Sequence, residues 1–77
     1  MKSYKIKFKV DIKHMIYINA VIDSYEGIGI IRTIDKKNGL VAVYTSEGQK
    51  KYLYEVLDSL RSEEINITDI SEEKTEQ

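Results

Sequence analysis

The stretch that decides the fold is YKIKFKV, residues 4–10, in which apolar residues and lysines alternate without interruption. Successive side chains of a β-strand point to opposite faces of a sheet, so a period of two predicts one buried face and one solvent-facing face. We therefore expect a strand whose solvent-facing side carries Lys5, Lys7 and Lys9. The expected core side chains of this strand are Tyr4, Ile6, Phe8 and Val10.

The period changes to a helical one over residues 12–26. Asp11 stands where a helix N-cap belongs, and Gly27 follows as a residue suited to a left-handed C-cap. Ile16 and Tyr17 lie outside the apolar stripe, and apolar residues beyond the core face of a helix indicate a surface that something else covers. The stripe itself, at i, i+3 and i+7 spacing, consists of Met15, Ile18, Val21, Ile22 and Tyr25.

A β-hairpin is predicted after this helix. Residues 28–34 are rich in β-branched side chains and predict a strand. Residues 40–44 are continuously apolar, which is typical of an interior strand with both faces at least partly buried. The Asn38-Gly39 pair between the two strands tolerates the positive φ angles of a tight hairpin loop.

The C-terminal half predicts one more helix and one more strand. Ser46 and Gln49 match a capping box at the start of the helix, and residues 65–70 predict the strand. The inward stripe of the helix consists of Leu53, Val56, Leu57 and Leu60. Residues 71–77 contain no apolar residue, so we expect a single domain over residues 1–70 and a disordered acidic tail over 71–77.

The two halves repeat one another at an offset of about 36 residues. A doubled βαβ unit joined by a hairpin predicts an α+β fold, the ferredoxin-like βαββαβ two-layer sandwich. Right-handed crossovers would place both helices on one face of an antiparallel sheet with strand order 4-1-3-2. The first and third strands would then be central, and the second and fourth would form the edges.

Composition limits the chemistry that the chain can perform. Its 77 residues suit one small domain with a limited core, and they include no cysteine and a single histidine, His14. Disulfides and thiolate metal sites are therefore excluded, and we expect no metal and no cofactor. No nucleophile, base and orienting acid occur in a recognisable arrangement, so we expect no catalytic residues and no enzyme. Since small domains often gain stability from a partner subunit, we expect a homodimer.

Charge and hydropathy bear on location and partners. The longest apolar stretch without a charge, around residues 15–22, is far shorter than the roughly 20 residues that span a bilayer. No signal-peptide core precedes the first strand, so we expect a cytoplasmic protein with no membrane association. The net charge of −1 argues against a dedicated nucleic-acid partner, because phosphate backbones require a basic footprint.

The sheet face without helices is expected to combine a row of lysines with an apolar patch. The third strand contributes either Val41 and Val43 or Leu40, Ala42 and Tyr44 to it, depending on its register. A face of this mixed character suggests a second subunit, packed sheet to sheet or edge to edge. Our candidate interface residues, on this face and on the first helix, are Lys5, Lys7, Lys9, Arg32, Val41, Val43, Tyr44, Ile16 and Tyr17.

The layout resembles the ACT and ACT-like regulatory domains. The likeness covers residues 4–70: a strand ending in Val10-Asp11, an apolar helix, the step Glu26-Gly27-Ile28 into the next strand, and a final segment over 64–67. The resemblance implies a module that pairs its sheets or edges and binds a small effector, often an amino acid. It places that ligand near the loop after the first strand, at Asp11, Lys13 and His14. The chain is also similar to small bacterial proteins described only as domains of unknown function.

Three functional hypotheses follow. The first is a non-enzymatic binding or regulatory module that acts as a homodimer with a small-molecule or protein partner. The second is a nucleic-acid-associated protein that holds phosphates with Lys5, Lys7, Lys9 and Arg32. The third is an adaptor or structural subunit that docks another protein through Ile16, Tyr17 and Ala20 on the first helix.

Overall fold

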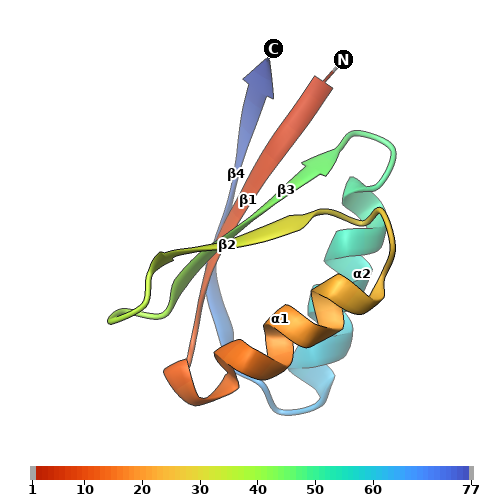
Figure 1. The fold of residues 1–77 in the computed structure, drawn as a ribbon. Coiled ribbons are helices and arrows are strands. Elements are labelled where there is room, and N and C mark those ends of the chain that lie inside the picture. Colours follow the sequence, from red (N-terminus) through yellow and green to blue (C-terminus); the bar gives the residue numbers. More distant parts are fainter. Residues whose placement is uncertain (1, 77) are drawn as a thin grey trace.

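The computed structural model describes residues 2–76 as an α+β fold with two α-helices and one four-stranded antiparallel sheet (Figure 1). The sheet order is β2-β3-β1-β4, which is the predicted order 4-1-3-2 read from the other edge. The elements are β1 (Lys2–Val10), a 3₁₀ helix η1 (Ile12–His14), α1 (Met15–Ser24), β2 (Ile30–Asp35), β3 (Leu40–Ser46), α2 (Lys50–Ser62) and β4 (Ile67–Glu76). Within residues 2–76 no helix has the length and hydropathy needed to cross a membrane.

The core is built on the apolar side of β1, as the alternation predicts. Ile6 and Phe8 have no exposed surface and lie opposite Val43 and Val41 of β3. Both helices add their buried side chains to the same cluster. Those side chains are Met15, Ile18 and Ile22 of α1 and Leu53, Val56, Leu57 and Leu60 of α2.

The register of β3 shows which of its side chains lie on the sheet face without helices. Val41 and Val43 are buried at 1% and 0% exposure, because their cross-strand partners on β1 are core residues. Tyr44, which lies opposite Lys5, is on the other face and is exposed. The prediction that Val41 and Val43 belong to an exposed interface is therefore wrong. The register places Leu40, Ala42 and Tyr44 on the lysine face instead, where Tyr44 is exposed, Leu40 is half-buried and Ala42 is buried.

Both helices begin later than predicted. Residues 12–14 form a 3₁₀ turn rather than the first turn of α1, and Asp11 makes no side-chain cap hydrogen bond. Ser46 is the last residue of β3 and pairs with Ser3, so it is not the N-cap of α2. The buried Thr45 hydroxyl, which donates to the Ile28 carbonyl at 2.7 Å, holds this end of β3 in the sheet.

The predicted disordered tail is wrong for residues 71–76, which continue β4 alongside β1; Gln77 lies outside the described residues. A β-bulge makes this long pairing possible. Between Lys7 and Lys9 the register shifts, so two residues of β4 oppose one of β1, and Asp69 there has a left-handed φ of 54°. The extra residue lets Ile67 and Ile70, which are three positions apart, both pack against the core.

Charge complementarity explains why an acidic segment pairs with β1. On the lysine face, the Lys7 ammonium lies 3.2 Å from a Glu73 carboxylate oxygen, and that of Lys9 lies 3.9 Å from Asp69. On the other face, Glu72 accepts hydrogen bonds from Lys50 at 3.0 Å and from the Tyr54 hydroxyl at 2.8 Å. Each exposed ion pair contributes little alone. Several of them lie along β4, including at Glu72 and Glu73, in the segment that composition alone assigned to a tail.

We expect the β4 pairing to make stability depend on pH. The hydrogen bonds from Lys50 and Tyr54 lower the pKa of Glu72. A carboxyl whose pKa is depressed by folding stabilises the fold above its ordinary pKa of about 4.3, and this is lost as pH falls through the lower folded value. Urea unfolding of Glu72→Gln should show a free energy of unfolding lower by less than about 1 kcal/mol at pH 7. The difference from wild type should be smaller at pH 3, below the ordinary pKa of a glutamate.

Glu64→Gln is the control for this experiment, because Glu64 is exposed and forms no ion pair among the described residues. It should leave the unfolding free energy almost unchanged at both pH values. An equal loss in both variants would contradict a specific role for Glu72.

A second stability prediction concerns the hairpin loop. Gly39 has a φ of +69°, and a Cβ at this position would collide with the carbonyl oxygen of Val10. Gly39→Ala should therefore lower the free energy of unfolding by about 2 kcal/mol or more. Gly48→Ala is the matched control, because a Cβ there meets open space; thermal and urea unfolding should show a change within about 0.5 kcal/mol. Equal effects of the two substitutions would refute this account.

Candidate functional site

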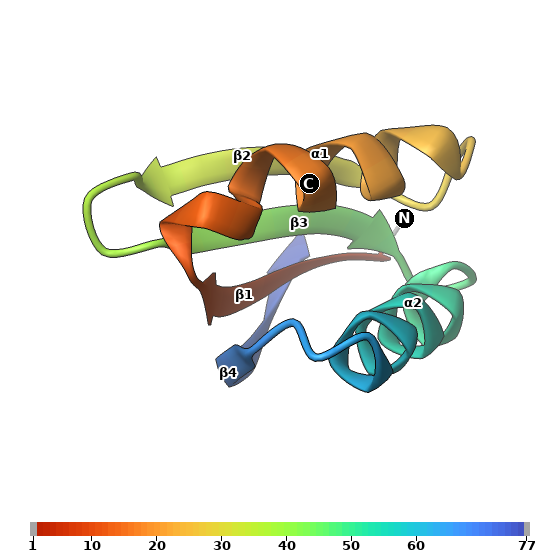
Figure 2. The ribbon, with the colours of Figure 1, turned by 90° about the horizontal axis from the view of Figure 1, so that it is seen from below.

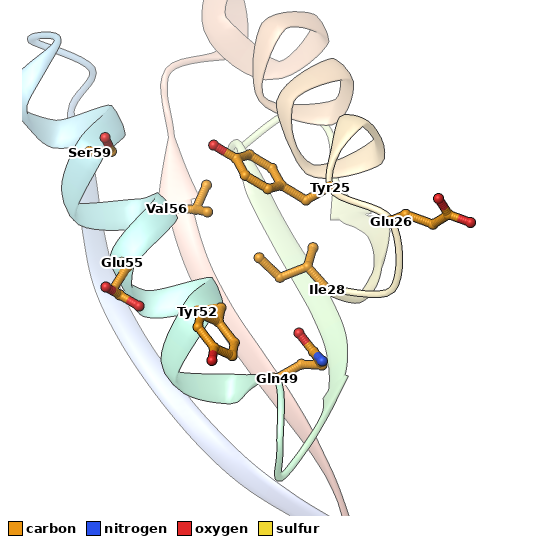
Figure 3. A pocket seen from close by; sticks show the side chains of 8 residues that line it. All are labelled: Tyr25, Glu26, Ile28, Gln49, Tyr52, Glu55, Val56 and Ser59. Carbon is orange, nitrogen blue, oxygen red and sulfur yellow. The ribbon is translucent and has the colours of Figure 1, made fainter.

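A hollow lies between the C-terminal end of α1 and the N-terminal half of α2 (Figure 3). Its volume is about 510 Å³, within the range of small-molecule sites in proteins. We call it the interhelix groove. Its lining residues are Tyr25, Glu26, Ile28, Gln49, Tyr52, Glu55, Val56 and Ser59.

The groove exists because the two helices pack on different parts of the sheet. α1 contacts β2, whereas α2 contacts β3 and β4. Figure 2 shows the two helices apart from one another as a result. Ile28 and Val56 are buried at 3% and 7% exposure and form an apolar floor, while Tyr25 and Tyr52 remain about half exposed.

Tyr25 reaches the groove because α1 ends one residue before it. Our helical stripe placed Tyr25 in the core, but its backbone is extended, with φ −92° and ψ 99°, and its side chain is 50% exposed. The ring points across the groove toward α2 (Figure 3). Gly27 then takes a φ of +83° and turns the chain toward Ile28. The available signal in the sequence was Gly27, since a stripe residue so close to a terminating glycine can leave the helix.

The groove is acidic. Glu26 and Glu55 line it, and neither forms an ion pair among the described residues. No lysine, arginine or histidine lines it. In Figure 3 the Glu26 carboxylate points away from α2, so Glu55 is the carboxylate on the α2 side. An apolar floor, two tyrosines and uncompensated negative charge make a site that disfavours anions.

A family model named Domain of unknown function (DUF4911) matches residues 8–63, which is most of the chain. The chain belongs to this family. The matched segment runs from within β1 to just beyond α2 and includes every residue that lines the interhelix groove. No curated protein and no solved structure matches the chain.

The ligand residues suggested by the ACT resemblance are not gathered into one cavity in this DUF4911 domain. Asp11 lines a small hollow of about 190 Å³ at the hairpin end of the sheet, together with Lys9, Val10, Asn38, Asn66 and Thr68. Lys13 and His14 do not line it. Lys13 is exposed and His14 is half-buried in η1.

The lysine face of the DUF4911 sheet is largely engaged by the chain itself. Lys7 and Lys9 face the carboxylates of β4, and the Lys5 ammonium lies 5.8 Å from the centre of the Tyr44 ring. Arg32 is exposed and donates to the carbonyl of Ile31 at 3.5 Å. Since acidic residues lie directly beside the lysines, this face is poorly suited to holding phosphates.

The two candidate residues on α1 differ in their surroundings. Ile16 is 86% exposed. The Tyr17 hydroxyl donates to Glu63 just after α2 at 2.8 Å, and this hydrogen bond to a carboxylate raises the pKa of Tyr17. Within residues 2–76 no group of three or more histidine or acidic side chains could hold a metal ion.

Proposed function

We propose that this chain is a non-enzymatic binding or regulatory module that acts as a homodimer with a small-molecule or protein partner. The proposal includes a ferredoxin-like, two-layer, ACT-like arrangement. The strand order and the single core shared by both helices and the sheet support this arrangement. The observation that carries the homodimer is the contrast between the two edges of the sheet.

The β4 edge has the features that prevent pairing between sheets. It carries a bulge at Asp69 and a series of charged residues over 72–74. The β2 edge also has a register shift, between Thr33 and Asp35, but it has no run of charged residues. It is a six-residue strand, IIRTID, in which Ile30 is 57% exposed and Ile34 is 44% exposed. An apolar edge without a lysine or proline is a favourable template for a second copy.

Antiparallel pairing of β2 with the same strand of a second copy is chemically reasonable in one register. Placing Thr33 opposite Thr33 of the second copy also places Arg32 opposite Ile34 and Ile31 opposite Asp35. No like charges then face each other directly across the interface. The result would be a continuous eight-stranded sheet, and a domain of this size gains from such an interface because its own core is small.

The homodimer is tested by sedimentation velocity over a range of concentrations. The wild-type chain should sediment as a dimer, and the double substitution Ile30→Lys with Thr33→Lys should sediment as a monomer, because lysines on an edge strand oppose pairing. Ser71→Lys on the other edge strand is the control and should leave the dimer intact. A wild-type monomer throughout, or a dimer that survives the double substitution, would refute pairing through β2.

A second candidate function is an adaptor that docks another protein through α1. The observation that favours it is a pair of exposed isoleucines one helical turn apart, Ile12 at 52% and Ile16 at 86% exposure. Isolated exposed apolar residues are common, but an isoleucine this exposed beside a second one forms a small apolar patch.

The adaptor candidate predicts that Ile16→Glu abolishes capture of specific partner proteins by the immobilised chain. Because Ile16 is outside the core, circular dichroism and thermal unfolding should stay close to wild type. Lys36→Glu in the hairpin loop is the control and should preserve capture. Partners that remain bound to Ile16→Glu would contradict docking through this patch.

A further inference from the structure

We propose that the interhelix groove binds a small organic cation, an ammonium or guanidinium group on an apolar body. This inference deepens the proposed function, since it rests on the chain being a binding module, but it does not depend on dimer formation. It is argued from the surroundings of the six tyrosines and from the charges that line the groove.

Tyr25 is the tyrosine for which the described residues supply neither a hydrogen-bond partner for the hydroxyl nor a cation over the ring. Tyr17 and Tyr54 donate to Glu63 and Glu72. The other three rings each lie beside a lysine of the chain: Lys50 is 3.9 Å from the centre of the Tyr4 ring, Lys51 is 5.1 Å from that of Tyr52, and Lys5 is 5.8 Å from that of Tyr44. Tyr25 therefore presents an open aromatic surface in the groove.

The charged residues that line the groove favour a positively charged ligand. The Glu26 and Glu55 carboxylates have no ion-pair partner within residues 2–76, whereas Asp58, Asp69, Glu72 and Glu73 each have one. No basic residue is among the lining residues, and the nearest described cation is Lys51, beside the Tyr52 ring, so the two lining carboxylates disfavour an anion. A cation would gain from Glu55 on the α2 side and from the negative face of an aromatic ring.

The apolar floor of the groove favours a ligand whose uncharged part is apolar. Ile28 and Val56 are buried and apolar, and they lie between Tyr25 and Tyr52 (Figure 3). A small inorganic cation would leave the half-exposed rings of Tyr25 and Tyr52 in contact with water. A ligand with an apolar body beside its charge would cover the floor and place its charge near the tyrosines, which is the usual composition of a small-molecule site.

The experiment uses three probes that share one apolar body and differ in charge: 2-phenylethylammonium, 2-phenylethanol and 3-phenylpropanoate. Each is titrated into the full chain labelled with ¹⁵N, and amide chemical shifts are followed. We expect 2-phenylethylammonium to shift the amides of residues 25–28 and 49–59 in a saturable manner. The alcohol should bind more weakly, and the carboxylate should not bind there.

Four substitutions and one control separate the contributions of the aromatic ring and of the charged residues to binding. Tyr25→Ala should weaken binding of 2-phenylethylammonium roughly two- to fivefold, the effect of one exposed cation–π contact, while Tyr25→Phe should retain it. Glu55→Gln should weaken it about twofold. Lys51→Gln should strengthen it, since it removes a positive charge beside Tyr52. Tyr44→Ala on the sheet face is the matched control and should change nothing.

The proposal is overturned if 3-phenylpropanoate or 2-phenylethanol binds the groove as tightly as 2-phenylethylammonium. It is also overturned if the ammonium probe shifts no groove amides, or if Lys51→Gln weakens its binding. Sedimentation velocity of the same samples separates the two proposals. A monomer that binds the ammonium probe refutes the homodimer alone, and a dimer that does not bind it refutes the cation site alone.

Discussion

Every other part of this small domain depends on the position of β1 between β3 and β4. Its apolar side chains Ile6 and Phe8 are fully buried and form the centre of the core that both helices cover. Its lysines Lys7 and Lys9 face the acidic residues of β4. One alternating strand thus supplies both the hydrophobic contacts that hold the helices and the charges that the last strand complements.

The positions of the helices on the sheet explain why so small a domain keeps a sizeable groove. α1 contacts the β2 side and α2 contacts β3 and β4, so the helices share a floor instead of packing closely against each other. The floor is apolar and buried, while the groove walls contain half-exposed tyrosines. A domain with little core to spare has therefore left two aromatic side chains half uncovered, which is the physical reason for assigning a ligand to the groove.

The two surfaces that we propose to be functional are close in the chain and separate in space. Ile28 forms part of the groove floor, and Ile30 begins the exposed edge strand β2 two residues later. Pairing of β2 with a second copy would engage the strand edge and leave the side chains of Tyr25, Tyr52 and Glu55 uncovered by that contact. A ligand and a partner subunit could therefore be bound at the same time, with Gly29 as the covalent connection between the two surfaces.

The order of the elements and the core side of β1 followed from the sequence alone, because periods of two and 3.6 depend only on local geometry. The strand order was predicted from the repeated βαβ unit and the preference for right-handed crossovers. The sequence also placed the hairpin at Asn38-Gly39, where Gly39 has the positive φ. Only the tertiary structure decided the rest. The tail became part of β4 because a bulge and ion pairs with β1 complement residues distant in sequence. Tyr25 is not in its predicted core position because α1 ends at Ser24. That Tyr25 and Tyr52 line the same groove depends on helix packing that no local pattern encodes.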